Sequence, residues 1–404
     1  MPGLLPDGDP VPPDGALPPS ALGEVGRRGF GVYVHVPFCA SRCGYCDFNT
    51  YTASEGVAST GYADAVLGEL ALAGRVLADP PPPQVDTVFF GGGTPTLLAP
   101  AELGRILAAI DRTWGLAPGA EVTTEANPES VSPASLARLR AAGFTRISLG
   151  MQSAAPHVLA VLDRRHTPGR AAAAAVEARE AGFANVNLDL IYGTPGETAA
   201  DFAGSLAMAL DAGVDHVSAY ALIVEEGTRL AARMRRGELP YPDDDVAADR
   251  YLAADYTLTG AGFSWYEVSN WARTDADRSR HNLLYWTGGD WWGLGPGAHS
   301  HVGGVRWWNV KHPTAYAARV RAGESPGQAR EILGPRERQT EGVLLGLRLA
   351  AGLPLSTLDR AGRGSARRAL ADGLLDAGAY AERRAVLTLR GRLLADAVVR
   401  DLLP

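Results

Sequence analysis

Three cysteines within eight residues are the strongest chemical signal in this chain. Cys39, Cys43 and Cys46 have the spacing C-x3-C-x2-C, and the other 401 positions hold no cysteine. Two kinds of site use such thiolates. One is structural zinc, with His35 as the fourth ligand. The other is an iron–sulfur cluster.

In the iron–sulfur interpretation, three thiolates leave one iron of a [4Fe–4S] cube without a protein ligand. The amino and carboxylate groups of a small molecule such as S-adenosylmethionine can chelate that iron. Reducing this molecule on the cluster would release a 5′-deoxyadenosyl radical. Small residues in the loop, such as Ala40, Ser41 and Gly44, leave room for a cube.

The location of the cysteines indicates a reducing compartment. Residues 1–28 are rich in proline and glycine and lack the basic start and apolar core of a signal peptide. We therefore expect a disordered tail at 1–28 and a cytoplasmic protein, in which clustered thiols bind metal rather than form disulfides.

Composition excludes two further classes of protein. The net charge of −7 provides no basic field for nucleic acid. No apolar run reaches the ~18 residues of a membrane helix. Hydrophobic residues make up 46% of the chain and charged residues 21%, as in globular proteins.

Six short apolar segments alternate with amphipathic, alanine-rich segments and predict an α/β fold. The predicted strands are 31–36, 85–90, 121–126, 146–151, 185–193 and 216–224, and the predicted helices are 60–78, 100–113, 133–142, 168–182 and 198–212. Such alternation is typical of a parallel sheet with helices outside. Six units are two short of a closed eightfold barrel, so we expect a partial, open (β/α)6 TIM-like barrel over residues 29–262.

Residues whose side chains could take part in binding or catalysis follow these strands. The first strand precedes the cysteines, and the second precedes the glycine-rich segment 91–95. Glu125 ends the third strand, Gln152 follows the fourth, and Asp189 lies in the fifth. Because chemistry gathers at the carboxyl edge of parallel strands, we expect these residues to converge on one mouth.

The second half has a different pattern. Residues 263–335 form an extension rich in Trp and His, which contains seven of the eight tryptophans. Residues 336–404 predict an α+β module of winged-helix type, with helices at 336–350, 355–361 and 365–376, a hairpin within 382–392 and a final helix. With 12 Arg and 9 acidic residues over 331–404, this module has too little excess charge to indicate DNA binding.

The cysteine motif with the glycine segment FFGGGTPT resembles the radical S-adenosylmethionine superfamily. The segments YVHVPFC, GMQS, LDRRHT and NLDLIYGTPGET resemble, more closely, the oxygen-independent coproporphyrinogen III oxidase family. This resemblance implies a [4Fe–4S] cluster on the three cysteines. It also implies a set of contacts to S-adenosylmethionine: Tyr33, Tyr45, Gly92, Gly93, Thr94, Glu125, Gln152, Arg164 and Asp189. Arg165 is the alternative to its neighbour Arg164.

Two features distinguish this chain within that family. Members that oxidise coproporphyrinogen carry a fourth cysteine where this chain has Phe48, and they have a longer N-terminal region. Both departures resemble a sister group of heme chaperones, as does the segment HNLLYW at 281–286. That resemblance implies heme binding in the Trp-rich extension with His281 as an axial or anchoring residue. The alternative is an aromatic core in which His281 is structural.

The resemblance therefore predicts a heme chaperone that delivers heme to an acceptor protein, which could be membrane-associated. Two alternatives remain: coproporphyrinogen III oxidase, and a radical enzyme acting on another substrate. We expect no coproporphyrinogen oxidation, no nucleic-acid partner, and a monomer or homodimer.

Overall fold

The computed structural model describes residues 7–56, 59–79 and 81–403. Within them, one twelve-stranded sheet organises the molecule, in the order β14-β13-β12-β11-β1-β4-β5-β6-β7-β8-β10-β9. Its six central strands are parallel neighbours in chain order. They are β1 (Phe30–Val36), β4 (Val85–Gly92), β5 (Leu116–Ala126), β6 (Arg146–Gln152), β7 (Asn185–Tyr192) and β8 (His216–Ala221). The predicted six-unit partial barrel is confirmed.

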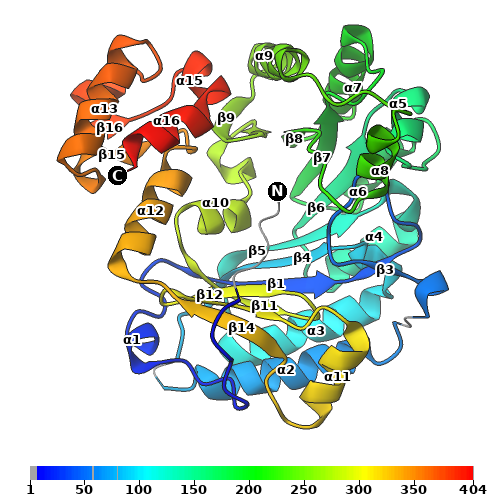
Figure 1. The fold of residues 1–404 in the computed structure, drawn as a ribbon. Coiled ribbons are helices and arrows are strands. Elements are labelled where there is room, and N and C mark those ends of the chain that lie inside the picture. Colours follow the sequence, from blue (N-terminus) through cyan, green and yellow to red (C-terminus); the bar gives the residue numbers. More distant parts are fainter. Residues whose placement is uncertain (1–6, 57–58, 80, 404) are drawn as a thin grey trace.

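Helices cover the outer face of these strands. The five helices predicted above form α2 (Tyr62–Val76), α3 (Pro100–Trp114), α4 (Pro133–Ala141), α6 (Arg170–Glu180) and α7 (Ala199–Asp211), and α9 (Asp244–Gly260) is a further long helix. Two short helices have no counterpart in the sequence prediction, α5 (Pro156–Val161) and α8 (Arg229–Arg235). Figure 1 shows α2, α3 and α11 (Pro313–Arg321) gathered on one side of β1 and β4.

The two faces of the central strands differ in chemistry. In β1, Phe30, Val32, Val34 and Val36 are fully buried and belong to the large core cluster beneath the helices. The alternate residues of the six strands face the barrel interior and are mostly polar. Examples are Thr87, Glu121, Arg146, Asn187 and His216, all buried. Strand alternation with period two therefore separates an apolar core from a polar interior.

The Trp- and His-rich extension joins the same sheet at both ends. β10 (Asn270–Ala272) pairs antiparallel with β8, and β9 (Ser264–Glu267) pairs with β10. β11 (Asp290–Leu294) pairs parallel with β1, at the opposite end of the six. β12 (His299–Val302), β13 (Val305–Asn309) and β14 (Gly327–Ile332) follow as antiparallel strands.

The N-terminal segment differs from the predicted disordered tail. Residues 1–6 of that prediction lie outside the described residues. Residues 7–28 contain α1 (Pro19–Leu22), and Asp9 exchanges backbone hydrogen bonds of 2.7 and 2.8 Å with Arg330 of β14. Leu17 and Ala21 are buried. These contacts with the distant β14 are long-range, so local composition alone did not indicate them.

The C-terminal residues build a small module with its own apolar core. It comprises α12 (Pro335–Gly346), β15 (Leu353–Pro354), α13 (Arg360–Ala371), α14 (Ala377–Ala381), β16 (Arg384–Ala385), α15 (Leu389–Leu393) and α16 (Ala395–Leu402). The predicted hairpin within 382–392 is wrong, because β16 pairs with the distant β15 and α15 is helical. The predicted helix at 355–361 is reduced to one 3₁₀ turn, Leu355–Thr357. A winged-helix fold stays a prediction.

A nearly buried ion pair joins this module to the barrel. Nη1 and Nη2 of Arg392 donate to the carboxylate of Asp255 on α9, at 2.8 and 3.0 Å. The two side chains are 10% and 14% exposed. Trp271 Nε1 donates to the same carboxylate at 3.0 Å, and the Arg392 guanidinium lies 4.4 Å from the Trp265 ring centroid. In Figure 1 the module accordingly lies beside β9 and α9.

Replacing Arg392 tests how strongly this contact holds the module. Arg392→Met keeps the aliphatic stem but leaves the Asp255 carboxylate with only the indole donor. We expect a loss of about 3 kcal/mol in the free energy of unfolding, measured by urea denaturation, since removing one partner of a buried pair leaves a buried charge. Arg390→Met is the matched control, because Arg390 is exposed and makes one 3.2 Å bond to the Asp372 carbonyl. Equal losses in both variants would contradict this interpretation.

Candidate functional site

One cavity of about 410 Å³ lies at the carboxyl ends of the central strands. All three cysteines line it, and so do eight of the nine predicted S-adenosylmethionine contacts. These are Tyr45, Gly92, Gly93, Thr94, Glu125, Gln152, Arg164 and Asp189. The predicted convergence at one mouth is therefore what the geometry shows. Tyr33 and His281 are not among the lining residues.

The loop that carries the cysteines is anchored to its neighbours through backbone groups. Gly93 N donates to the Val36 carbonyl at 2.8 Å, and Thr94 N donates to the Phe38 carbonyl at 2.7 Å. On its other side, Gly44 N donates to the Leu162 carbonyl at 2.9 Å. The fold thus holds the loop across the mouth without using the thiols.

The three thiols open into one space at the mouth of the barrel. Among the described residues, no three His, Cys, Asp or Glu side chains converge closely enough to hold one metal ion. The cysteines instead line a shared space. Burial raises the pKa of the Cys46 thiol to about 11 and also raises that of Cys39. A cationic iron group would favour the thiolates that ligation requires.

His35 is not available as a zinc ligand in this structure. Its ring is 6% exposed, and both nitrogens have partners. Nε2 contacts the Asn49 carbonyl at 2.9 Å, and Nδ1 contacts the Tyr33 hydroxyl at 3.0 Å. The ring also explains the glycine at position 92, where a Cβ would lie 2.5 Å from it and φ is +107°. His35 therefore positions both the cysteine loop and the glycine segment.

Two carboxylates form the acidic part of the cavity. Glu125 Oε2 accepts from Gly92 N at 3.0 Å, and burial, with a smaller contribution from Asp189, raises the pKa of Glu125 to about 7. Burial also raises the pKa of Asp189, although hydrogen bonds oppose the shift. Ser148 and Asn187 each donate to Asp189 at 2.8 Å. Two adjacent, desolvated carboxylates would attract a cationic ligand.

Arg164 provides the positive charge of the cavity. Nη2 donates to the Gly150 carbonyl at 2.8 Å, and Nη1 lies 3.6 Å from Cys43 Sγ. Nε is buried and has no partner among the described residues. The neighbouring Arg165 is exposed and does not line this cavity, so the geometry selects Arg164 of the two.

Gln152 reaches the cavity through an irregular backbone. It follows a register shift in the pairing of β6 with β7, and its φ of +65° is unusual for a residue other than glycine. Such bulges often re-aim a side chain at a site.

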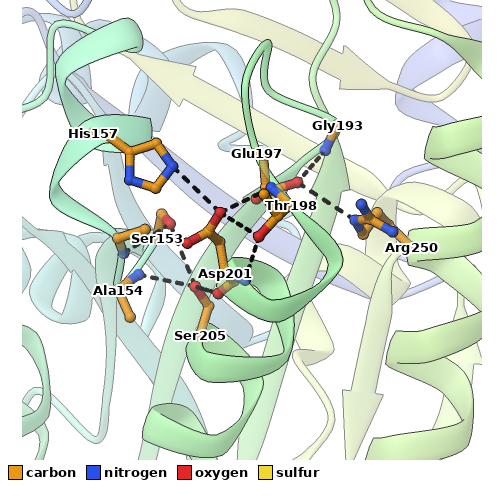
Figure 2. Close-up of polar contacts among 10 residues, drawn as sticks. Ser153, Ala154, His157, Gly193, Glu197, Thr198, Asp201, Ser205 and Arg250 are labelled. Carbon is orange, nitrogen blue, oxygen red and sulfur yellow. Dashed lines mark hydrogen bonds and ion pairs between the residues drawn. The ribbon is translucent and has the colours of Figure 1, made fainter.

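The segment after β6 is joined to α7 by polar contacts, which Figure 2 shows. Ala154 N donates to Ser205 Oγ of α7 at 2.9 Å, and His157 of α5 lies 3.3 Å from Asp201.

The turn after β7 is fixed by its own acid. Glu197 accepts from Gly193 N at 2.8 Å, and Arg250 of α9 lies 4.0 Å away (Figure 2). Burial raises the pKa of Glu197 to about 7. Thr198 then caps α7 by accepting from Asp201 N. These contacts fix the turn that joins β7 to α7.

Tyr33 and His281 lie deeper in the barrel than the cavity. His281 is 1% exposed, and it belongs to α10 (Arg280–Trp286) rather than to a loop. Its Nδ1 contacts Thr87 Oγ1 at 2.8 Å, and its Nε2 contacts the Tyr285 hydroxyl at 2.8 Å. Tyr33 and Phe89 stack beside the ring, with centroids 6.4 and 5.1 Å from it.

In this arrangement neither nitrogen of His281 is free for heme iron. Burial lowers the pKa of His281 to about 3, so the imidazole is neutral and held by hydrogen bonds. Four of the seven tryptophans of the extension are core residues: Trp271, Trp292, Trp307 and Trp308 are at most 6% exposed. The geometry gives His281 a structural role, and its predicted role toward heme stays a prediction.

Sequence reasoning missed several residues that line the cavity. Ser148 and Gly150 alternate with apolar residues in β6, so the period of two could have revealed them. Phe48, Tyr220 and Ile223 also line it, and they are 62%, 40% and 66% exposed. No feature of the sequence indicated that Ile223 would line a cavity, because the predicted strand 216–224 continued through it.

Comparison with known proteins agrees with this site. The pattern of the Radical SAM superfamily matches residues 33–209, which include all three cysteines. The fold resembles that of coproporphyrinogen III oxidase (HemN) from Escherichia coli, a radical SAM enzyme, with a TM-score of 0.80 at 24% identity over 95% of this chain and 92% of that one. Fold and site thus define a protein of the radical SAM class.

The heme chaperone HemW from Mycobacterium tuberculosis is 58% identical over 384 residues, covering 95% of this chain and 97% of that protein. HemW from Synechocystis is 37% identical over 333 residues, covering 81% and 79%. The chain belongs to the HemW family.

The first site prediction concerns the carboxylate of Glu125. We expect Glu125→Gln to weaken S-adenosylmethionine binding about tenfold at pH 8, since a charge-assisted contact contributes roughly 1.5–3 kcal/mol. The difference from the parent should shrink as pH falls through about 7, because the parent carboxyl then becomes neutral too. Equilibrium binding to anaerobically reconstituted protein measures this. Glu129→Gln, an exposed acid outside the cavity, is the control, and a pH-independent difference would contradict the assignment.

The second site prediction concerns His281. His281→Phe fills the space but leaves the Thr87 and Tyr285 hydroxyls without their partner, so we expect about 1–3 kcal/mol less stability against urea. If the role is structural, the Soret band and heme affinity of the folded variant match the parent. A shifted Soret band with weaker heme binding would instead identify His281 as a ligand.

Proposed function

We propose that this protein binds heme and passes it to an acceptor protein. Its close similarity to a named heme chaperone over nearly the whole of both chains carries this proposal. The similarity includes the cavity, the extension and the C-terminal module. The fold shared with coproporphyrinogen III oxidase does not carry a substrate with it, because a fold can support many activities.

Within this proposal, Cys39, Cys43 and Cys46 hold a [4Fe–4S] cluster and the cavity holds S-adenosylmethionine. When reduced, such a cluster supplies an electron that can cleave S-adenosylmethionine. Arg164 would stabilise negative charge at the thiolates, given its 3.6 Å approach to Cys43. Glu125 and Asp189 would hold the cationic ligand, while Gly92 and Gly93 permit close approach of the backbone.

Phe48 supports the chaperone over the oxidase. By the family resemblance given above, members that oxidise coproporphyrinogen carry a fourth cysteine where this chain has Phe48. The Phe48 side chain is 62% exposed at the cavity and can bind no iron.

We further propose that the protein acts in the cytoplasm. The acceptor could be membrane-associated, and no helix in the described part of this chain is long and apolar enough to cross a membrane.

One experiment tests this function directly. Anaerobically reconstituted protein should bind heme saturably in a Soret titration. The same sample, given S-adenosylmethionine, a strong reductant and an electron acceptor, should form no protoporphyrinogen. Sustained turnover would support the oxidase instead.

A cysteine variant is the matched control for this experiment. Cys39→Ser should lose most of its iron and acid-labile sulfide, whereas Ser41→Ala in the same loop should keep both. Stoichiometric zinc without sulfide in the parent would overturn the cluster assignment.

A further inference from the structure

Three exposed apolar or aromatic side chains stand at the entrance of the cluster cavity. They are Phe48 after the last cysteine, Tyr220 in β8 and Ile223 after β8, and we call them the apolar rim. They are 62%, 40% and 66% exposed, and all three line the same cavity. Exposed apolar groups that gather at a cavity, with polar residues around them, are typical of a ligand-binding surface.

The floor beneath this rim is polar. Glu125, Asp189, Gln152 and Arg164 form it together with the cysteines. The floor therefore suits a charged cofactor. The three rim side chains themselves carry no charge, although Asp47 and Glu225, close to Phe48 and Ile223 in sequence, also line the cavity. The two layers indicate two ligands of different chemistry, one within the cavity and one across its entrance.

The β8–α8 side of the rim is held firmly against the cysteine loop. Leu230 N donates to the Gly44 carbonyl at 2.8 Å, at the start of α8. Leu222 and Leu230 share an apolar cluster with the partly buried Tyr45 of the cysteine loop. Ile223 does not belong to this cluster and is 66% exposed, whereas its neighbour Leu222 is 7% exposed.

An exposed guanidinium lies on the α8 side of the cysteine loop, where its partner Asp163 faces Gly44. Arg229, which precedes Leu230, is 68% exposed and contacts Asp163 at 3.4 Å, a long ion pair in water. Such exposed pairs contribute little, so the guanidinium can exchange Asp163 for another carboxylate. An apolar ligand that carries carboxylates would meet both requirements.

Heme has this chemistry: a flat apolar macrocycle with two propionates at one edge. We propose that heme docks across the apolar rim, with one face of the macrocycle against Phe48 and Ile223 and a propionate near Arg229. This inference rests on the proposed heme-binding function. It places heme next to the cluster cavity instead of at the buried His281, whose nitrogens are both engaged.

The rim also matches what a carrier requires. Among the described residues that line the cavity there is no histidine. Heme on the rim would therefore be retained by apolar contact rather than by a strong imidazole bond. An acceptor that supplies its own axial ligand could then withdraw it.

Substitutions at the rim test this proposal. In Soret titrations of the full-length, anaerobically reconstituted protein, Phe48→Ala and Ile223→Ser should each weaken heme binding about tenfold, given the area these side chains would bury. The double variant should weaken it further. Arg229→Ala should have a smaller effect, about twofold, as expected for an exposed ion pair.

Matched controls separate this effect from general loss of surface apolarity. Tyr256→Ala and Ile332→Ser change side chains that are 85% and 49% exposed and lie outside the cavity, and they should bind heme as the parent does. Iron content and S-adenosylmethionine affinity, measured on every variant, should be unchanged. That result shows that the cavity is intact.

Two outcomes would overturn the proposal in different ways. If the parent binds heme and the double rim variant binds it equally well, heme docks elsewhere and only this inference fails. If the parent itself binds no heme, the proposed function fails, and the rim proposal fails with it. Weaker heme binding with lost iron would assign Phe48 to the cluster loop and also overturn the rim proposal.

Discussion

The hydrogen bond from His35 to the Asn49 carbonyl joins the barrel to the loop that carries the cysteines. Asn49 continues the connection, because its Nδ2 donates to the carbonyls of Pro296 and Lys311 at 3.0 and 2.9 Å. The second half of the chain thus helps to hold the cysteine loop. Burial lowers the pKa of His35, so this joint is neutral and does not depend on an ion pair.

The polar interior of the barrel makes such neutral contacts necessary. Asn187 donates to Ser148 at 2.6 Å, and His216 bridges Asn187 and the Tyr266 hydroxyl at 2.7 Å on each side. Satisfied groups of this kind cost little, whereas an unpaired one would cost about 1–3 kcal/mol. The interior is therefore a connected layer beneath the cavity, and it fixes Asp189 from below.

The six strands could be predicted from local rules, and so could the convergence of the cysteines, the glycine segment, Glu125, Gln152 and Asp189. Tyr45 and Arg164 were predicted only from the family resemblance. Short apolar runs indicate the strands, and the parallel topology then brings their carboxyl ends together. The structural position of His281 could not be predicted in this way, since a histidine suits a ligand position and a core position equally. Its burial depends on α10 packing against β4, a contact between residues almost 200 positions apart. The hairpin at 382–392 failed for the same reason, as β15 outcompeted a local partner.

The parallel pairing of β11 with β1 has a consequence for how the protein is made. Val34 of β1 pairs with Leu294 of β11. One edge of β1 therefore stays unpaired until a segment some 260 residues further along the chain has left the ribosome. At a synthesis rate of about 5–20 residues per second, that edge stays open for roughly 13–50 s. Unpaired strand edges invite association with other chains. A nascent chain of this protein would thus be a natural client for chaperones during translation, well before it could carry a ligand of its own.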